Sequence, residues 1–173
     1  ERLSNGLCSL RPKEDKLTFA CVFELDRNAN VLKHWIGRTI IHSDRRFAYE
    51  EAQECIDNQA GDFFQELTLL NNLAKMIRKK RFDHGAVNFE TVEVKFKLDE
   101  AGKPLGLFVK ERKDIHKLIE EFMLLANRKV AEHLSKIKIH SKPLSVPYRI
   151  HDDPDEEKLI PFVAFAKKFG HKF

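Results

Sequence analysis

The stretch Lys110–Asn127, with the sequence KERKDIHKLIEEFMLLAN, predicts a long helix that continues to about Ser135. Apolar residues recur in it every three or four positions, which is the period of one helix face. The members of this face are Ile115, Leu118, Ile119, Phe122, Met123, Ala126, Val130 and Leu134. We therefore expect the helix to pack against the core along this face.

Polar side chains border the predicted face. At ~100° per residue, His116, Glu120 and Asn127 lie together on one flank of it, whereas Glu121 lies on the solvent side. Residues on such a margin are usually half-buried hydrogen-bonding groups, which is the simplest interpretation. The other interpretation is that the helix packs the core with its face and lines a cleft with its edge.

Composition limits the class of protein. The 173 residues fit one domain, and a hydrophobic content of 42% is sufficient for a core. Charged residues make up 34% and the formal net charge is +4, which permits nucleic-acid binding but does not indicate it. No apolar run approaches the ~20 residues of a membrane-spanning helix, so we expect neither a membrane partner nor a signal peptide.

The cysteines indicate the compartment. Cys8, Cys21 and Cys55 are scattered, odd in number and form no C-x-x-C pair, so the sequence predicts neither a disulfide framework nor a zinc site. We expect a reducing, cytoplasmic setting. The chain starts at Glu1, without a methionine and directly in a motif-like segment, so we also expect a piece of a longer protein.

Alternating apolar residues predict two hairpins. Residues 17–25 and 31–41 form the first, joined by the turn sequence DRNAN. Residues 92–98 and 105–111 form the second, joined by DEAGK. Hairpins that are each followed by helices favour an α+β fold, with antiparallel hairpins packed against several helices, over a doubly wound parallel sheet.

Two further helices are predicted between the hairpins, at about 49–56 and 62–82. Ala48 precedes the first, where a capping Ser or Thr would stabilise the helix by about 1 kcal/mol more. The second ends in the basic run Arg78–Arg81. We interpret this run as a solvated helix end whose cations complement the helix dipole, with phosphate binding as the less favoured alternative.

Towards the C-terminus we expect a short strand at 147–151 and then one more helix. Asp153 as the N-cap and Pro154 at the first helical position predict a helix start there, which we prefer to a metal site. Pro161 is expected to kink this helix, and Gly170 to end it.

The standard catalytic signatures are absent from the sequence: there is no phosphate-binding loop, dinucleotide fingerprint, G-x-S-x-G or H-E-x-x-H. Aromatic residues beside basic ones are more informative. Arg45, Arg46 and Phe47 precede Tyr49, and Phe89 follows the basic run. Single-stranded nucleic acids bind by base stacking on aromatic rings in a positive groove, so these segments are candidate nucleic-acid-binding sites.

Five segments of the chain, taken in order, resemble a known family. They are LSNGLCSLRP at 3–12, IHSDRRFAYEEAQ at 41–53, GAVNFE at 85–90, ERKDIHKLIEEFMLLAN at 111–127 and YRIHDDP at 148–154. Together they resemble the central part of the catalytic RNB domain of the ribonuclease II family, most closely its ribonuclease R branch. The resemblance implies a processive 3′→5′ exoribonuclease that uses Mg²⁺ and hydrolyses RNA, from single-stranded 3′ ends, to nucleoside 5′-monophosphates.

The resemblance also implies roles for individual residues. Tyr49 matches a tyrosine of the active-site tunnel near the last phosphates, and Glu120 matches a glutamate that helps to settle the 3′-terminal nucleotide. These two are the predicted catalytic residues, and we expect them to face a common groove. Phe89 matches an aromatic residue that stacks on the terminal bases. The other predicted RNA-binding residues are Arg45, Arg46, His116 and Asn127.

The resemblance further implies what residues 1–173 lack. The metal-binding aspartates of the family belong before Leu3, and its catalytic arginine belongs beyond Phe173. We therefore expect one partial RNB domain that holds no metal ligands or bound Mg²⁺ and does not degrade RNA alone. RNA is the expected partner, and DNA is not. Two alternatives stay open: a basic RNA-binding module without chemistry, and a piece for protein interaction.

Overall fold

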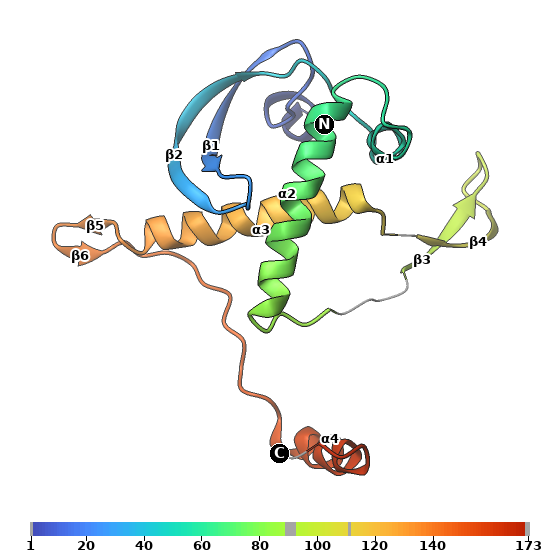
Figure 1. The fold of residues 1–173 in the computed structure, drawn as a ribbon, viewed down its shortest axis with the longest axis vertical. Coiled ribbons are helices and arrows are strands. Elements are labelled where there is room, and N and C mark those ends of the chain that lie inside the picture. The colour runs from blue at the N-terminus through green and yellow to red at the C-terminus, as the bar shows by residue number, and fades with distance from the viewer. Residues whose placement is uncertain (1, 89–92, 111, 172–173) are drawn as a thin grey trace. The chain divides into compact units, whose positions relative to one another are not determined.

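The computed structural model describes residues 2–88, 93–110 and 112–171, and it divides into two compact units, 1–133 and 134–173. The first unit holds two hairpins, a short π-helical segment and three α-helices; the second holds a small hairpin and one α-helix. Figure 1 shows these elements in chain order. The mixture of helices with small antiparallel sheets confirms the predicted α+β class.

The first hairpin agrees with its prediction. Strands β1 (Asp15–Leu25) and β2 (Val31–His42) pair antiparallel around the DRNAN turn. The Asp26 carboxylate accepts hydrogen bonds from the backbone N–H groups of Asn28 (2.9 Å) and Asn30 (2.8 Å). These bonds, chiefly those from Asn30, lower the pKa of Asp26, because they stabilise its charged form. The turn therefore has the Asp-centred geometry that its sequence predicts.

On β2, the indole ring of Trp35 lies over Gly37. The two residues are two positions apart, so they share one face of the strand. A Cβ atom built at Gly37 would lie 2.6 Å from Cη2 of Trp35, which is closer than real contacts allow. Gly37 thus provides the space in which the indole lies against the strand.

We predict that Gly37→Ala displaces the Trp35 ring towards solvent and shifts its fluorescence emission to longer wavelength. Trp35 is the single tryptophan of residues 1–173, so the emission of this chain reports on that ring. The ring is already 52% exposed, so the free energy of unfolding should change by only about 0.5 kcal/mol. Gly106→Ala is the control, since nothing lies within 4 Å of a Cβ atom there. An unchanged spectrum for Gly37→Ala would show that the ring does not depend on this space.

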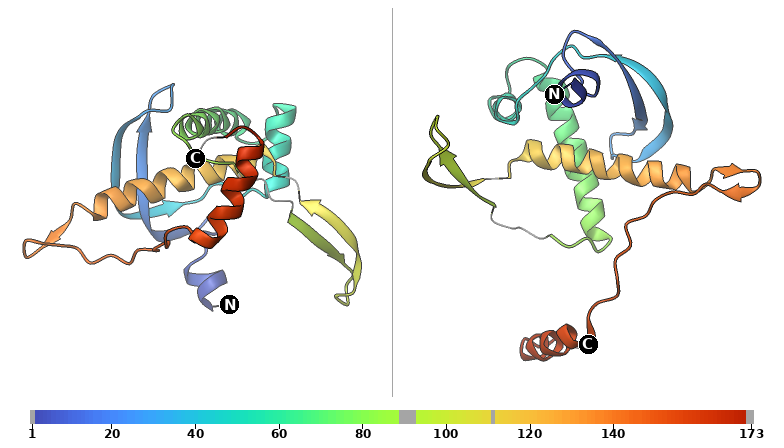
Figure 2. Two further views of the ribbon diagram at one scale, coloured as in Figure 1. Left: turned by 90° about the horizontal axis from the view of Figure 1, so that it is seen from below. Right: turned by 180° about the vertical axis from the view of Figure 1, so that it is seen from behind.

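Helices α1 (Tyr49–Asn58), α2 (Phe64–Asp83) and α3 (Asp114–Leu134) form the core of the first unit. They agree with the predicted helices to within a few residues at each end. In the drawn views α2 crosses α3 (Figures 1 and 2). Small alanines on α1 and α2 let the helices approach the larger side chains of α3. The buried cluster consists of Ala52, Ala74, Ile115 and Leu118, with Phe47, Ile56, Leu67 and Phe122 packed against it.

The second hairpin follows its predicted pattern. Strands β3 (Glu93–Leu98) and β4 (Pro104–Lys110) pair antiparallel. Asp99 accepts hydrogen bonds from the backbone N–H groups of Ala101 (3.0 Å) and Lys103 (2.8 Å), which closes the DEAGK turn. The turn chemistry of both hairpins is thus the same: an aspartate that binds the N–H groups two and four residues on.

The second unit departs from the prediction in two places. The segment 147–151 forms no strand; the strands of this unit are β5 (Lys138–Ile139) and β6 (Lys142–Pro143), joined through His140 and Ser141 in left-handed conformations. This turn was missed because it lacks the Asn and Gly that usually adopt such conformations.

The last helix, α4 (Glu156–Lys168), starts later than predicted. Its N-cap is Asp155, whose carboxylate accepts from the N–H of Glu157 at 3.0 Å, and not Asp153. The residue before a proline disfavours helical geometry, and a second capping aspartate was available on the other side of Pro154. Pro161 lies inside this helix, and Gly170, at φ +83°, follows its end.

Candidate functional site

Tyr49 and His116, two of the predicted site residues, stack on each other. Tyr49 is the first residue of α1, and its ring lies parallel to that of His116 on α3, with centroids 4.4 Å apart and an interplanar angle of 12°. Tyr49 is 46% exposed. In contrast, Nδ1 of His116 is buried and has no hydrogen-bond partner among the described residues. The pair therefore presents part of the Tyr49 ring to solvent and keeps Nδ1 of the partly buried imidazole away from it.

Glu120 lies one helical turn beyond His116 and is surrounded by arginines. Its carboxylate is 3.4 Å from Arg112, 3.6 Å from Arg81 and 3.8 Å from Arg78. Its side chain keeps 32% of its exposure, so it can still meet a ligand. Arg78 and Arg81 also pair with the neighbouring Glu121, so three guanidinium groups face two carboxylates here. The excess of one positive charge means that a phosphate is not repelled.

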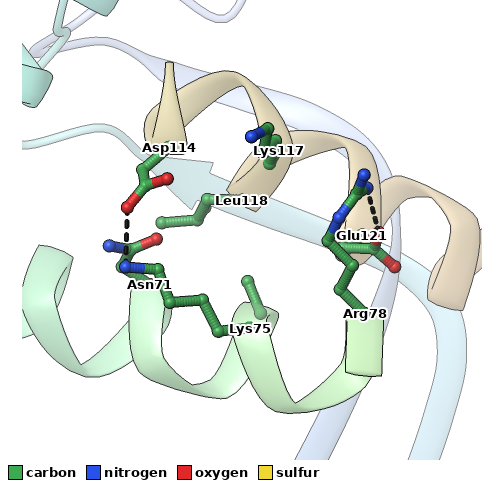
Figure 3. Close-up of a pocket in the computed structure, with 8 residues that line it drawn as sticks. Asn71, Lys75, Arg78, Asp114, Lys117, Leu118 and Glu121 are labelled. Atoms are coloured by element: carbon green, nitrogen blue, oxygen red, sulfur yellow. Dashed lines mark hydrogen bonds and ion pairs between the residues drawn. The ribbon is translucent and has the colours of Figure 1, made fainter. Parts of the chain in front are cut away.

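Glu121 is the most buried large side chain in the described part of the chain, with 1% of its surface exposed. Its carboxylate receives hydrogen bonds from Arg78 (3.2 Å) and from Nε and Nη2 of Arg81 (3.1 and 2.6 Å). The hydrogen bond from Arg81 raises the pKa of that guanidinium, because the carboxylate favours its charged form. Figure 3 shows Arg78 of α2 reaching Glu121 across the helix contact.

The prediction that Glu121 faces solvent is wrong. The buried side of α3 runs through Ile115, Leu118 and Glu121, while Met123, assigned to the apolar face, is 58% exposed. Apolar periodicity places a carboxylate outside because burying an unpaired charge is costly. Two arginines from another helix remove that cost by pairing with it, so the buried face is rotated relative to the apolar stripe.

The expectation that the basic run at the end of α2 is solvated is wrong except at Lys79. The ammonium group of Lys79 pairs with Asp83 on the same helix at 2.7 Å. Arg78 and Arg81 bind Glu121. Lys80 donates to the carbonyl oxygen of Asn28 at 2.7 Å and to the side chain of Asn30, which attaches α2 to the β1–β2 turn. The run thus connects elements of the first unit.

Polar side chains join α2 to the start of α3. Asp114 forms an ion pair with Lys75 at 2.6 Å, and this hydrogen bond lowers the pKa of Asp114. Figure 3 shows this ion pair between Asp114 and Lys75. A side-chain hydrogen bond with Asn71, which is buried, lowers the pKa of Asp114 further. The cavity that these residues line has a volume of about 20 Å³, which is room for one water at most.

The other predicted site residues are more scattered. Arg45 pairs with Glu51 and with Asp62 (3.4 Å), and its guanidinium lies 4.9 Å from the centroid of the Phe47 ring. Arg46 lies beside it in the loop before α1, and Asn127 is exposed on α3; both are open to solvent. Phe89 lies outside the described residues.

Sequence reasoning missed the arginines that surround Glu120 and Glu121. Arg112 lies in the quoted helix motif, and Arg78 and Arg81 lie in the basic run that we had assigned to solvent. Arginines three residues apart fall on one helix face, which is the signal that could have indicated a shared partner. Nothing local indicates that the partner lies some 40 residues further on.

A metal site is not formed by the part of the chain that the structure describes: no group of three or more His, Cys, Asp or Glu side chains there could hold a metal ion. The two neighbouring glutamates of α3 are already paired with arginines. Because guanidinium groups repel a cation, this carboxylate pair does not fit Mg²⁺. None of the described helices is both long and apolar enough to cross a membrane.

The comparisons with known proteins decide the family. The RNB domain model matches residues 1–173, the whole of this chain. The chain belongs to the RNB family. This result confirms the resemblance inferred from the five sequence segments.

Relatives of this RNB domain carry different names. It is 37% identical over 187 residues to DIS3-like exonuclease 2 of Schizosaccharomyces pombe, across 99% of this chain and 20% of that protein. It is 35% identical to ribonuclease R 1 of Lactococcus lactis, across 98% and 21%. It is also 34% identical to a protein of Arabidopsis thaliana named inactive exonuclease DIS3L2, across 97% and 17%. The chain thus spans about a fifth of the length of these relatives.

Solved structures share the fold. The RNase R of Mycoplasma genitalium in complex with ribose-methylated single-stranded RNA matches with a TM-score of 0.84 and 24% identity, across 99% of this chain and 27% of that chain. The same enzyme in complex with double-stranded RNA matches with a TM-score of 0.84 and 25% identity, across 96% and 30%. The RNB domain described here therefore has the fold of the corresponding part of that enzyme.

Proposed function

We propose that this RNB domain is part of an exoribonuclease that degrades RNA from its 3′ end and releases nucleoside 5′-monophosphates. The observation that carries the proposal is the family match over all of residues 1–173, with relatives that are named exonucleases or ribonuclease R at 35–37% identity. The geometry is compatible with it, because Tyr49 stacks on His116, Glu120 follows His116 by one turn of α3, and Tyr49 and Glu120 are both partly exposed.

In this proposal Tyr49 contacts the last phosphates and Glu120 orients the 3′-terminal nucleotide. Arg78, Arg81 and Arg112 hold the Glu120 carboxylate in place and offset its charge, so that a phosphodiester can approach. Substrate placement of this kind contributes to rate because the reacting groups are held near their reactive geometry. The further RNA contacts that we propose are Phe89, Arg45, Arg46 and Asn127. His116, the remaining residue predicted to bind RNA, lies against Tyr49.

Divalent metal dependence is a general property of the family, and a bound Mg²⁺ would supply charge stabilisation at the scissile phosphate. The carboxylates of the described residues do not fit that ion, so we propose that its ligands lie outside residues 1–173 and that these residues form one partial catalytic domain. We further propose that the enzyme is cytoplasmic and that its partner is RNA with a single-stranded 3′ end. In this proposal it binds neither DNA nor a membrane.

A second candidate function is RNA binding without hydrolysis. It is favoured by one observation, the 34% identity to a relative that is named an inactive exonuclease. Release of labelled mononucleotides from a 3′-tailed RNA by the full-length protein, in the presence of Mg²⁺, distinguishes the two. Tight RNA binding without mononucleotide release would favour the second candidate.

We predict that Glu120→Ala in the full-length enzyme slows mononucleotide release about 10- to 100-fold, which is the effect of losing one charge-assisted contact. The melting temperature should stay near that of the wild type, because the Glu120 side chain is 32% exposed and its ion pairs are partly screened by water. Glu54→Ala is the control, since Glu54 is an exposed glutamate of α1. Equal rates for Glu120→Ala, Glu54→Ala and the wild type would contradict the role of Glu120.

A further inference from the structure

Tyr49 has no support from its own helix. Side chains of a helix lean back over the preceding turn, which limits their rotamers. Tyr49 is the first residue of α1 and therefore has no preceding turn on which to lean. Almost half of its surface is exposed, so packing leaves one side of the ring open. A residue on another element must supply the surface that holds the phenol in one orientation.

His116 supplies that surface. Its ring covers one face of the Tyr49 ring at 4.4 Å, almost parallel. Stacked aromatic pairs at such distances contribute beyond the area that they bury. The imidazole is unusual in that its Nδ1 atom is buried and unpaired within the described residues. A polar atom placed so is destabilising by itself, which indicates that the ring is there for its flat surface and not for a hydrogen bond.

The position of His116 is set independently of the ring contact. The side chain of Gln53, which is buried on α1, accepts a hydrogen bond from the backbone N–H of Ile115 at 3.0 Å. Ala52 of α1 and Ile115 of α3 belong to the same buried cluster. The residue next to Ile115 is thus held against α1 by contacts that do not involve the two rings.

We propose that His116 is a positioning residue that holds the Tyr49 phenol in its RNA-contacting orientation by stacking, and that it does not itself contact the RNA through a hydrogen bond. The inference rests on the proposed function. It replaces direct RNA binding by His116 with an indirect role through Tyr49. His116 also lies one turn, about 6 Å along the helix, before Glu120, so it connects the two residues assigned to the site.

The test uses the full-length enzyme with single-stranded RNA and the variants His116→Ala, His116→Phe and His116→Gln. Loss of the ring in His116→Ala should lower kcat about two- to tenfold, which corresponds to one stacked pair, with a smaller change in KM. His116→Phe keeps a flat ring and should restore most of the rate. His116→Gln keeps hydrogen-bonding groups without the ring and should resemble His116→Ala.

A double variant identifies the path of the effect. Tyr49→Ala combined with His116→Ala should be no slower than Tyr49→Ala alone, because a residue that acts through Tyr49 has no effect once the phenol is absent. Additive losses would overturn the inference. So would a wild-type rate for His116→Ala, or a His116→Phe variant as slow as His116→Ala. If His116→Ala does not fold, the comparison of His116→Phe with His116→Gln decides alone.

The outcomes separate this inference from the proposed function. If Tyr49→Ala slows RNA degradation and the His116 variants do not, the function stands and the positioning role is overturned. If the wild type releases no mononucleotides, or Tyr49→Ala is as fast as the wild type, the assigned function or site is wrong and the positioning role falls with it. Slow Ala and Gln variants with a rescued Phe variant support both.

Discussion

Glu121→Ala is expected to destabilise the full-length protein by about 3 kcal/mol, at the lower end of the range for breaking a buried ion pair. Glu121 is 1% exposed, and its carboxylate receives three hydrogen bonds from Arg78 and Arg81. Its removal leaves both guanidinium groups without their main counter-charge and leaves a space in the helix contact. The effect stays at the lower end because the side chains of Arg78 and Arg81 keep 20% and 31% of their exposure.

Glu120→Ala is the matched control, since it removes the same side chain from the neighbouring position. Glu120 keeps 32% exposure and its ion-pair distances are 3.4–3.8 Å, so its loss should change the free energy of unfolding by less than about 1 kcal/mol. Thermal or denaturant unfolding of both variants measures the difference. Equal melting temperatures, or a greater loss for Glu120→Ala, would show that the arginines do not stabilise the fold through Glu121.

The second large effect is expected for Gln53→Ala, which should destabilise the protein by about 2–3 kcal/mol. Gln53 is 7% exposed, and its Oε1 atom accepts from the N–H of Ile115, one of the first residues of α3. The first N–H groups of a helix have no partner within it. Because Ile115 is itself buried, water cannot replace Gln53, and the N–H group would be left unpaired in the core.

Gln65→Ala is the control for this prediction, because Gln65 is an exposed glutamine of α2, and its loss should change stability by no more than about 0.5 kcal/mol. A melting temperature of Gln53→Ala close to that of Gln65→Ala would contradict the role of the buried hydrogen bond. Because Gln53 also fixes α1 against α3, the variant should lose RNA degradation together with stability if the Tyr49–His116 stack depends on that contact.

Much of the local structure was predictable from the sequence. The two hairpins follow from alternation, and their turns follow from Asp26 and Asp99, each of which binds backbone N–H groups a few residues away. The helices of the first unit follow from apolar periodicity and end close to the predicted positions. These features depend on residues near one another in the chain, so a single sequence contains the information for them. Family membership was equally readable, because five segments occur in one order.

The candidate site was predictable only in part. Tyr49, His116 and Glu120 could be named from the motifs. The structure brings the rings of Tyr49 and His116 into contact, and Glu120 lies one turn further along α3. Their exact roles stay predictions. The stack itself could not be anticipated, since two aromatic rings 67 positions apart carry no local sign that they will meet.

What only the tertiary structure decided is where the charges lie. A periodic pattern treats every glutamate as polar and every basic run at a helix end as solvated, so it places Glu121 and the basic run on the surface. The structure buries Glu121 and brings Arg78 and Arg81 to it from another helix. A charge can leave water only when an opposite charge accompanies it, and that partner is determined by the packing of α2 against α3 and not by the residues beside it in the chain.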